Sequence, residues 1–166
     1  MKDHTMSTTR FWITSLSTLL NQTQHWIKRG GYRQDHANIL APGCGNQSDA
    51  ALNPLTQINA RGLGLLRRFE RLQSHCEQGV REIERAVLRQ VKVPLTSNQF
   101  SALVSLTYHL GEASLKRSML LSYLNAGCYQ QAADEFERWI YIGSRPSAEL
   151  RSRRRAEKRL FLRIDP

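Results

Sequence analysis

The chain has 166 residues, a length that predicts one domain, with a possible terminal extension, and a core that needs no disulfides. Apolar residues make up 40% and charged residues 23%, which is typical of a folded globular protein and excludes disorder of the whole chain. Lys and Arg number 24 against 14 Asp and Glu, and the net charge of +10 favours a polyanionic partner: nucleic acid, anionic lipid or anionic cell-wall polymer.

The first 57 residues predict a separate N-terminal segment. Residues 1–28 carry a loose apolar stripe that indicates a short helix, and residues 29–57 are rich in Gly, Asn, Gln, Asp and Pro, which indicates a loop or linker. The uncharged run 11–27 is too short and too polar for the ~20 apolar residues of a membrane span, so we expect no stable span. A weak export or membrane-surface segment is the alternative for this run.

Residues 58–166 predict a helical domain, because apolar residues recur at helical spacing and no sustained period-two alternation occurs. The first helix has Asn59 as its N-cap and carries Glu70 near its far end. The only β-like run is 91–95, which Pro94 interrupts. The fold class is therefore all-α, with short helices joined by short turns.

Capping residues predict where the later helices begin and end. Thr96 and Gln99 form a capping-box pattern at the start of a helix that Gly111 ends. Ser118 caps the next helix. Residues 129–140 predict another helix, closed by Gly143, and Pro146 suits the first turn of the last helix.

The last helix is strongly basic. Residues 145–163 hold eight Lys or Arg against two Glu, and apolar residues interrupt the basic run at helical spacing. This pattern favours a core helix with a basic outer face over a nucleic-acid-binding helix, although nucleic acid stays open as a partner.

Metal ligands and cofactor loops are not evident in the sequence. Three cysteines, Cys44, Cys76 and Cys128, show no metal-ligand or redox spacing, which favours packed thiols, with one disulfide as the alternative. The five histidines form no zinc pattern, and no glycine-rich phosphate loop precedes a helix. We therefore expect neither metal nor cofactor.

Glu70 is the acid whose setting raises the question of catalysis. It follows Phe69 at the C-terminal end of an apolar helix, where partial desolvation and the helix dipole both favour a protonated carboxyl. Arg67, Arg68 and Arg71 lie beside it and favour the ionised form instead. Glu70 is thus either a surface acid in salt bridges or a general acid of the kind a glycosidase uses.

Four motifs between Val93 and Phe161 resemble the C-terminal helical lobe of phage-type lysozymes, the endolysins of glycoside hydrolase family 24. They are "VPLTSNQFSALVSL" (93–106), "SMLLSYLNAG" (118–127), "AADEFERW" (132–139) and "RRRAEKRLF" (153–161). "INARGLGLLRRFE" (58–70) is similar to the first helix of that family, which ends at its catalytic glutamate. The resemblance covers about 105 residues and is carried by long, ordered motifs.

The resemblance implies a muramidase, which cleaves the β-1,4 bond between N-acetylmuramic acid and N-acetylglucosamine in peptidoglycan. It implies Glu70 as the catalytic acid and an arginine of the last helix beside it, for which Arg153 and Arg154 are the candidates; we take Arg154 as the substrate-binding residue. Peptidoglycan is then the expected partner of a monomer that is made in the bacterial cytoplasm and acts at the cell wall or periplasm.

The sequence departs from the family after Glu70. Arg71 replaces the small residue that normally follows the acid, and the positions of the second catalytic residue and of the threonine fall on Gly79 and Arg85. Cys76 stands three residues too early to be the second catalytic residue.

The β lobe of the family is also missing from this stretch. Only 22 residues separate Glu70 from Val93, and they have a helical pattern. Residues 30–38, "GGYRQDHAN", show a faint likeness to the missing motif but precede Glu70. Two functions therefore stay open: a peptidoglycan hydrolase with an unusual site, or a lysozyme-like protein that binds cell wall or a partner without turnover.

Overall fold

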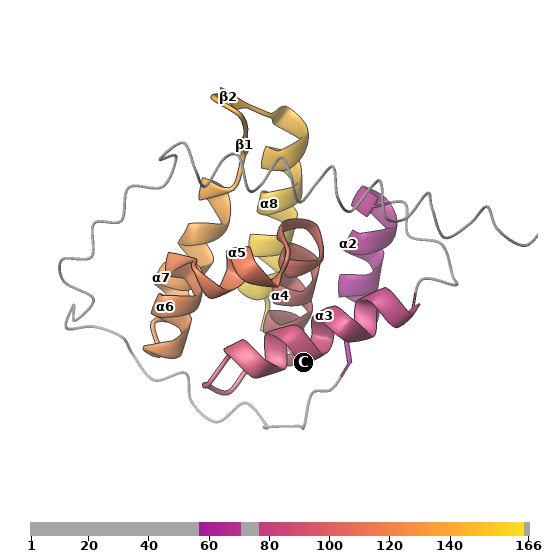
Figure 1. Ribbon diagram of the computed structural model, residues 1–166, viewed down its shortest axis with the longest axis vertical. Helices are drawn as coiled ribbons and strands as arrows, with labels where there is room; N and C mark the ends of the chain where they lie inside the picture. Colours follow the sequence, from indigo (N-terminus) through magenta and orange to yellow (C-terminus); the bar gives the residue numbers. More distant parts are fainter. Residues whose placement is uncertain (1–56, 71–76, 165–166) are drawn as a thin grey trace, which may run out of the picture.

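A computed structural model describes residues 57–70 and 77–164, which form a bundle of short helices (Figure 1). The helices are α2 (Ala60–Glu70), α3 (Glu77–Gln90), α4 (Ser97–Leu110), α5 (Glu112–Lys116), α6 (Met119–Asn125), α7 (Tyr129–Asp134) and α8 (Ala148–Phe161). The 3-10 helix η1 (Glu135–Arg138) and two antiparallel strands, β1 (Tyr141–Ile142) and β2 (Arg145–Pro146), connect α7 to α8. The all-α prediction is confirmed. The predicted helix in 1–28, and the linker up to residue 56, lie outside the described residues.

Helix α4 is the centre of the bundle (Figure 1), and α2, α3 and α8 pack against it. Eleven of its 14 residues are buried, including four apolar ones, Phe100, Ala102, Leu103 and Val104, that have no exposed surface. A helix that is buried on almost every side must be surrounded by other helices. The polar residues of α4 therefore face neighbouring helices instead of water.

The predicted helix starts are confirmed by their capping hydrogen bonds. Thr96 Oγ1 accepts from the Gln99 backbone N–H at 3.2 Å, and Gln99 Oε1 accepts from the Thr96 backbone N–H at 2.9 Å, which completes the capping box of α4. Asn59 Oδ1 accepts from the Gly62 N–H at 2.9 Å at the start of α2, and Ser118 caps α6. Each bond satisfies a backbone donor that the helix itself leaves unpaired.

The segment between α7 and α8 differs from the sequence-based expectation. The predicted helix 129–140 ends early, as η1, and strands β1 and β2 then project beyond the helices at one end of the molecule (Figure 1). Gly143 allows the tight turn between them because its φ is +61°. Pro146 lies in β2, and Ser147 is the N-cap of α8, with its Oγ accepting from Leu150 N–H at 3.3 Å. The β-like run 91–95 forms no strand.

Cys128 corrects the expectation of packed thiols. It is buried at the start of α7 and takes part in a disulfide. Its partner cysteine lies outside the described residues. A cross-link of this kind limits the conformations of the unfolded chain.

Helix α2, which carries Glu70, approaches α4 closely at Gly62. A Cβ atom at that position would lie 2.7 Å from the Ser101 Cβ and 2.6 Å from the Ile58 Cγ1, both closer than real side chains tolerate. Two residues further on, a Cβ atom at Gly64 would have no heavy atom within 4 Å. Gly62 therefore allows the close packing of α2 on α4, whereas Gly64 does not take part in it.

These two glycines form a matched pair for a stability test. We expect Gly62→Ala to destabilise the fold by about 1–3 kcal/mol, because the new methyl group overpacks the contact between α2 and α4. Gly64→Ala should stabilise it by roughly 0.5–1 kcal/mol through helix propensity. Urea unfolding followed by circular dichroism measures both, and the same sign for the two variants would contradict the close approach at Gly62.

Candidate active site

Glu70 is the last residue of α2, and Arg153 of α8 binds it. The Glu70 side chain is 17% exposed, and Arg153 Nη1 donates a hydrogen bond to Glu70 Oε1 in an ion pair. The guanidinium of Arg153 also lies over the Phe69 ring, with its Cζ 5.7 Å from the ring centroid. The predicted pairing of the acid with an arginine of the last helix is thus confirmed, and Arg153 is the residue that makes it.

The Arg153 guanidinium is held on its inner side by two further acceptors. Its Nε donates to Glu157 Oε1 at 3.0 Å, and its Nη2 donates to the Ser105 backbone carbonyl at 3.1 Å. Only 3% of the Arg153 side chain is exposed. Arg153 therefore spans from the interior of the bundle to the partly exposed carboxyl of Glu70.

Glu157 is the buried carboxylate behind this pair. Its side chain has no exposed surface, yet three donors satisfy it. Ser105 Oγ donates to Oε1 at 2.8 Å, beside the Arg153 Nε, while Arg154 Nη1 pairs with Oε2. Hydrogen bonds from charged donors offset much of the cost of burying a carboxylate.

Arg154, the residue expected to contact substrate, is fully buried. Besides Glu157, it binds the Trp139 carbonyl through Nε at 3.2 Å and the His109 Nδ1 through Nη2 at 2.6 Å. Burial lowers the pKa of Arg154, while the charges of Glu157 and, more weakly, Glu70 raise it. These contacts give Arg154 a role in packing α8 against α4 and η1, and its placement lends no support to a substrate contact.

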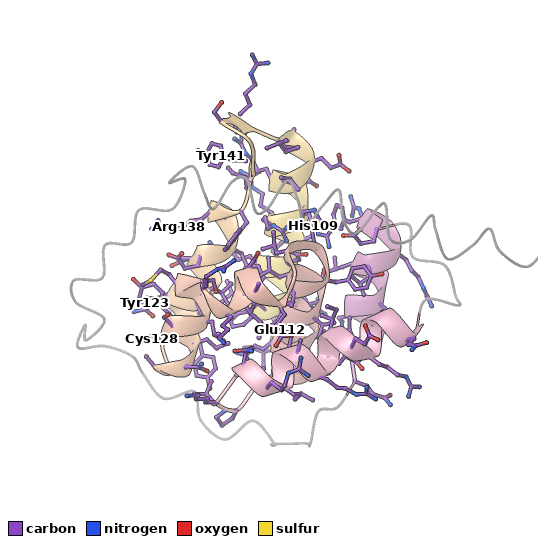
Figure 2. All side chains as sticks on the ribbon, viewed as in Figure 1. His109, Glu112, Tyr123, Cys128, Arg138 and Tyr141 are labelled. Carbon is purple, nitrogen blue, oxygen red and sulfur yellow. The ribbon has the colours of Figure 1, made fainter. Side chains whose placement is uncertain are left out.

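His109 is a neutral side chain at the end of α4, beside α8 (Figure 2). Burial, together with the positive charges of Arg153 and Arg154, lowers its pKa to about 3. Because the Arg154 guanidinium can only donate, His109 Nδ1 accepts, and we assign the ring proton to Nε2 from this partner.

The two positions to which the resemblance assigns further catalytic residues carry no acid beside Glu70. Gly79 lies on α3, where an added Cβ would reach only the Tyr108 ring at 3.9 Å, and Arg85 is an exposed residue of the same helix. Arg71 and Cys76 lie outside the described residues. Only six residues join α2 to α3, too few to form a β lobe.

Three members of the buried network were not singled out from the sequence: Ser105, His109 and Glu157. The spacing of Glu157 from Arg154 and Arg153, three and four residues along one helix, was the available signal for an ion cluster. Ser105 and His109 sit on a helix whose sequence gives no indication of which face meets α8. Within the described residues, no group of three His, Cys, Asp or Glu side chains could hold a metal ion.

None of the described helices has the length and apolar character needed to cross a membrane. The basic residues of the last segment, 145–163, fall into two groups in the structure: some form ion pairs, and the others are exposed. Arg153 and Arg154 are buried in ion pairs, and Lys158 binds Asp134 and Glu137 at 3.0 and 3.3 Å. The exposed cations that remain between 145 and 163 are Arg145, Arg151, Arg155, Arg159 and Arg163.

Comparison with known families places the chain. The phage lysozyme family model matches residues 27–157. The chain belongs to the phage lysozyme family. The match begins well before Ile58, so it includes residues 27–56, which lie outside the described part of the chain.

Individual relatives are endolysins of bacteriophages. The endolysin of Salmonella phage P22 is 36% identical over 104 residues, which cover 63% of this chain and 70% of the relative. The endolysin of Bacillus phage B103 is 42% identical over 93 residues, which cover 56% of this chain but only 35% of the relative.

Two solved structures resemble the described bundle. The muramidase domain of SpmX from Asticaccaulis excentricus superimposes with a TM-score of 0.61 at 25% identity, covering 66% of this chain and all of that domain. A mutant of P22 lysozyme gives a TM-score of 0.58 at 26% identity, with the same coverage of both chains.

The low pKa of His109 predicts how stability depends on pH. In the unfolded chain His109 has the ordinary histidine pKa of 6.5, whereas in the folded protein its pKa is about 3. The stabilisation from neutral His109 is therefore complete above pH 6.5 and is lost as the pH falls toward 3, at up to about 1.4 kcal/mol per pH unit.

The variant His109→Gln isolates this contribution, because its amide oxygen can still accept from Arg154 but cannot titrate. Urea unfolding between pH 7 and pH 4 should show a steeper loss of stability in the parent protein than in the variant. Equal slopes for the two proteins would contradict a neutral His109 in the folded protein.

Proposed function

We propose that the protein is a peptidoglycan hydrolase of the muramidase type, in which Glu70 donates the proton to the glycosidic oxygen as the β-1,4 bond breaks. The observation that carries the proposal is the placement of Glu70 at the partly exposed end of α2, bound to Arg153 of α8. Membership of the phage lysozyme family and the muramidase neighbour SpmX support the same reaction.

The contacts of Glu70 suggest which of its oxygens acts. Arg153 holds Oε1, and among the described residues no donor binds Oε2. A general acid must place its proton within hydrogen-bond reach of the leaving oxygen, so an oxygen that no described residue binds suits that role. Arg153 then fixes the carboxyl plane while Oε2 faces the substrate.

The exposed Lys and Arg side chains favour binding to peptidoglycan, which is a polyanion. The net charge of +10 is distributed over a surface that includes Arg67 and Arg68 next to Glu70 on α2. Peptidoglycan carries carboxylates on its sugars and peptides, so this surface would attract it. We place the protein at the bacterial cell wall, after synthesis in the host cytoplasm, in line with the endolysins it resembles.

A second function is favoured by one observation, the six-residue connection between α2 and α3. Glycosidases of this kind normally use two carboxylates. Of the described residues, Glu157 is the only other carboxylate bound to Arg153, and it is fully buried. A lysozyme-like protein that binds the cell wall without turnover would keep the helical lobe and have no need of the second carboxylate.

The hydrolase proposal predicts the effect of Glu70→Gln. Loss of the proton donor should lower the release of soluble fragments from purified peptidoglycan by roughly 10²-fold or more, because general acid catalysis contributes about 10²–10⁴-fold. Glu82→Gln, which removes an exposed carboxylate of α3, is the matched control and should retain activity. An inactive parent protein, or equal activity in both variants, would refute the proposal.

Co-sedimentation with the same peptidoglycan distinguishes a protein that binds without turnover from a hydrolase. The binding protein should pellet equally as parent and as Glu70→Gln, and should release no fragments in either form. Added salt should weaken the pelleting, because screening reduces the attraction of exposed cations to the polymer. Pelleting with no dependence on salt would contradict a charge-driven contact.

A further inference from the structure

We propose that Glu157 is the positioning residue of the site. Its buried carboxylate binds each of the two adjacent arginines of α8 through a different oxygen, and this orients Arg153 toward Glu70. The inference rests on the proposed function for its catalytic consequence, because the orientation of Glu70 affects turnover only if Glu70 is the acid. The positioning itself can be measured without turnover.

The two oxygens of Glu157 divide the arginines between them. Oε1 accepts from Arg153 Nε at 3.0 Å and from Ser105 Oγ at 2.8 Å, while Oε2 pairs with Arg154 Nη1. The carboxylate reaches both arginines because it lies four and three residues after them on the same helix. Each arginine is thereby assigned its own oxygen.

Binding through Nε determines where the rest of the Arg153 guanidinium points. The guanidinium is planar, so fixing Nε on Glu157 and Nη2 on the Ser105 carbonyl leaves Nη1 directed at Glu70. Exposed fractions rise along this line, from 0% at Glu157 through 3% at Arg153 to 17% at Glu70. The buried end of the chain of contacts therefore orients the end that meets solvent.

Glu70 alone would not select between the two arginines. Its charge reaches Arg154 as well as Arg153, since it raises the pKa of Arg154, although burial of Arg154 has the larger, opposite effect. Arg154 is instead directed to the Trp139 carbonyl and to His109. With Glu157 neutral, two neighbouring buried cations would repel each other and share one carboxylate, so Arg153 would lose its fixed orientation.

The test compares Glu157→Gln with Glu84→Gln in the full chain. Glu84 is the matched control because it is also buried, at 5% exposure, and accepts from the Ile58 backbone N–H at 2.6 Å without touching either arginine. The amide oxygen of a glutamine can still accept this bond, so Glu84→Gln removes a buried charge and leaves the start of α2 anchored. Side-chain 15N NMR of the arginines reports the Nε–H and the Nη groups separately. A guanidinium held on three sides gives distinct, slowly exchanging Nη signals.

The expected result is a shifted Nε signal and merged Nη signals for Arg153 in Glu157→Gln, with the parent spectrum retained in Glu84→Gln. Unchanged Arg153 signals in Glu157→Gln would overturn the proposal. Activity per folded molecule provides the second readout. We expect kcat on peptidoglycan to fall about tenfold or more with KM within about twofold, as misplacement of a catalytic group predicts.

An equal fall of kcat in Glu84→Gln would also overturn the proposal, because it would show a general effect of losing a buried carboxylate. If the parent protein has no turnover, the proposed function fails, and the arginine spectra alone decide whether Glu157 positions Arg153. Should Glu157→Gln not fold, Ser105→Ala replaces it, since it removes only the Oγ hydrogen bond to Glu157 Oε1. It should move the Arg153 Nε signal in the same direction by a smaller amount, and an unmoved signal would overturn the proposal.

Discussion

The packing of α8 depends on the ion pairs that the buried carboxylate of Glu157 forms with Arg153 and Arg154. Two adjacent arginines on a helix would normally stay exposed to water, because burying unpaired charge costs free energy. Glu157, together with Glu70 at the edge, balances the charge of the two arginines and accepts hydrogen bonds from both. Helix α8 can therefore press Leu160 and Phe161 into the core, where Phe161 meets Phe136 with ring centroids 5.5 Å apart.

Helix α2 is held at both ends by polar contacts, and this fixes the position of Glu70. At its start, Glu84 of α3 and Ser101 of α4 accept from the backbone N–H groups of Ile58 and Asn59, at 2.6 and 2.9 Å. At its end, Glu70 binds Arg153. An isolated helix of 11 residues is marginal in water. Its geometry therefore derives from α3, α4 and α8, so the acid is positioned by the whole bundle.

The fold could be predicted largely from local signals. The capping residues Asn59, Thr96 and Ser118 marked three helix starts correctly, because a cap depends only on residues within one turn. The short hairpin before α8 was missed. Its strands have two residues each, too few for an alternating pattern, and Gly143 was read as the end of a helix instead of as the turn between strands.

The site could be predicted only in part. The family resemblance predicted Glu70 as the acid and limited its partner to Arg153 or Arg154. Neighbouring residues on a helix point about 100° apart, and the sequence alone does not determine the rotation of α8 about its axis. The structure settles that rotation through contacts distant in sequence, from Glu157 to Ser105 and from Arg154 to His109. The roles of Glu70 in catalysis and of Arg154 in substrate binding stay predictions, as does the division of the chain at residue 57.

The short connection between α2 and α3 has a consequence for engineering. Helix α2 packs on α4 and α8, and helix α3 packs on α4 and α5, so both flanking helices are positioned by contacts other than the six residues that join them. The entropic cost of a loop rises by only about 0.6 kcal/mol for each doubling of its length. A longer segment could therefore be grafted between Glu70 and Glu77, which makes the helical bundle an acceptor scaffold for inserted domains.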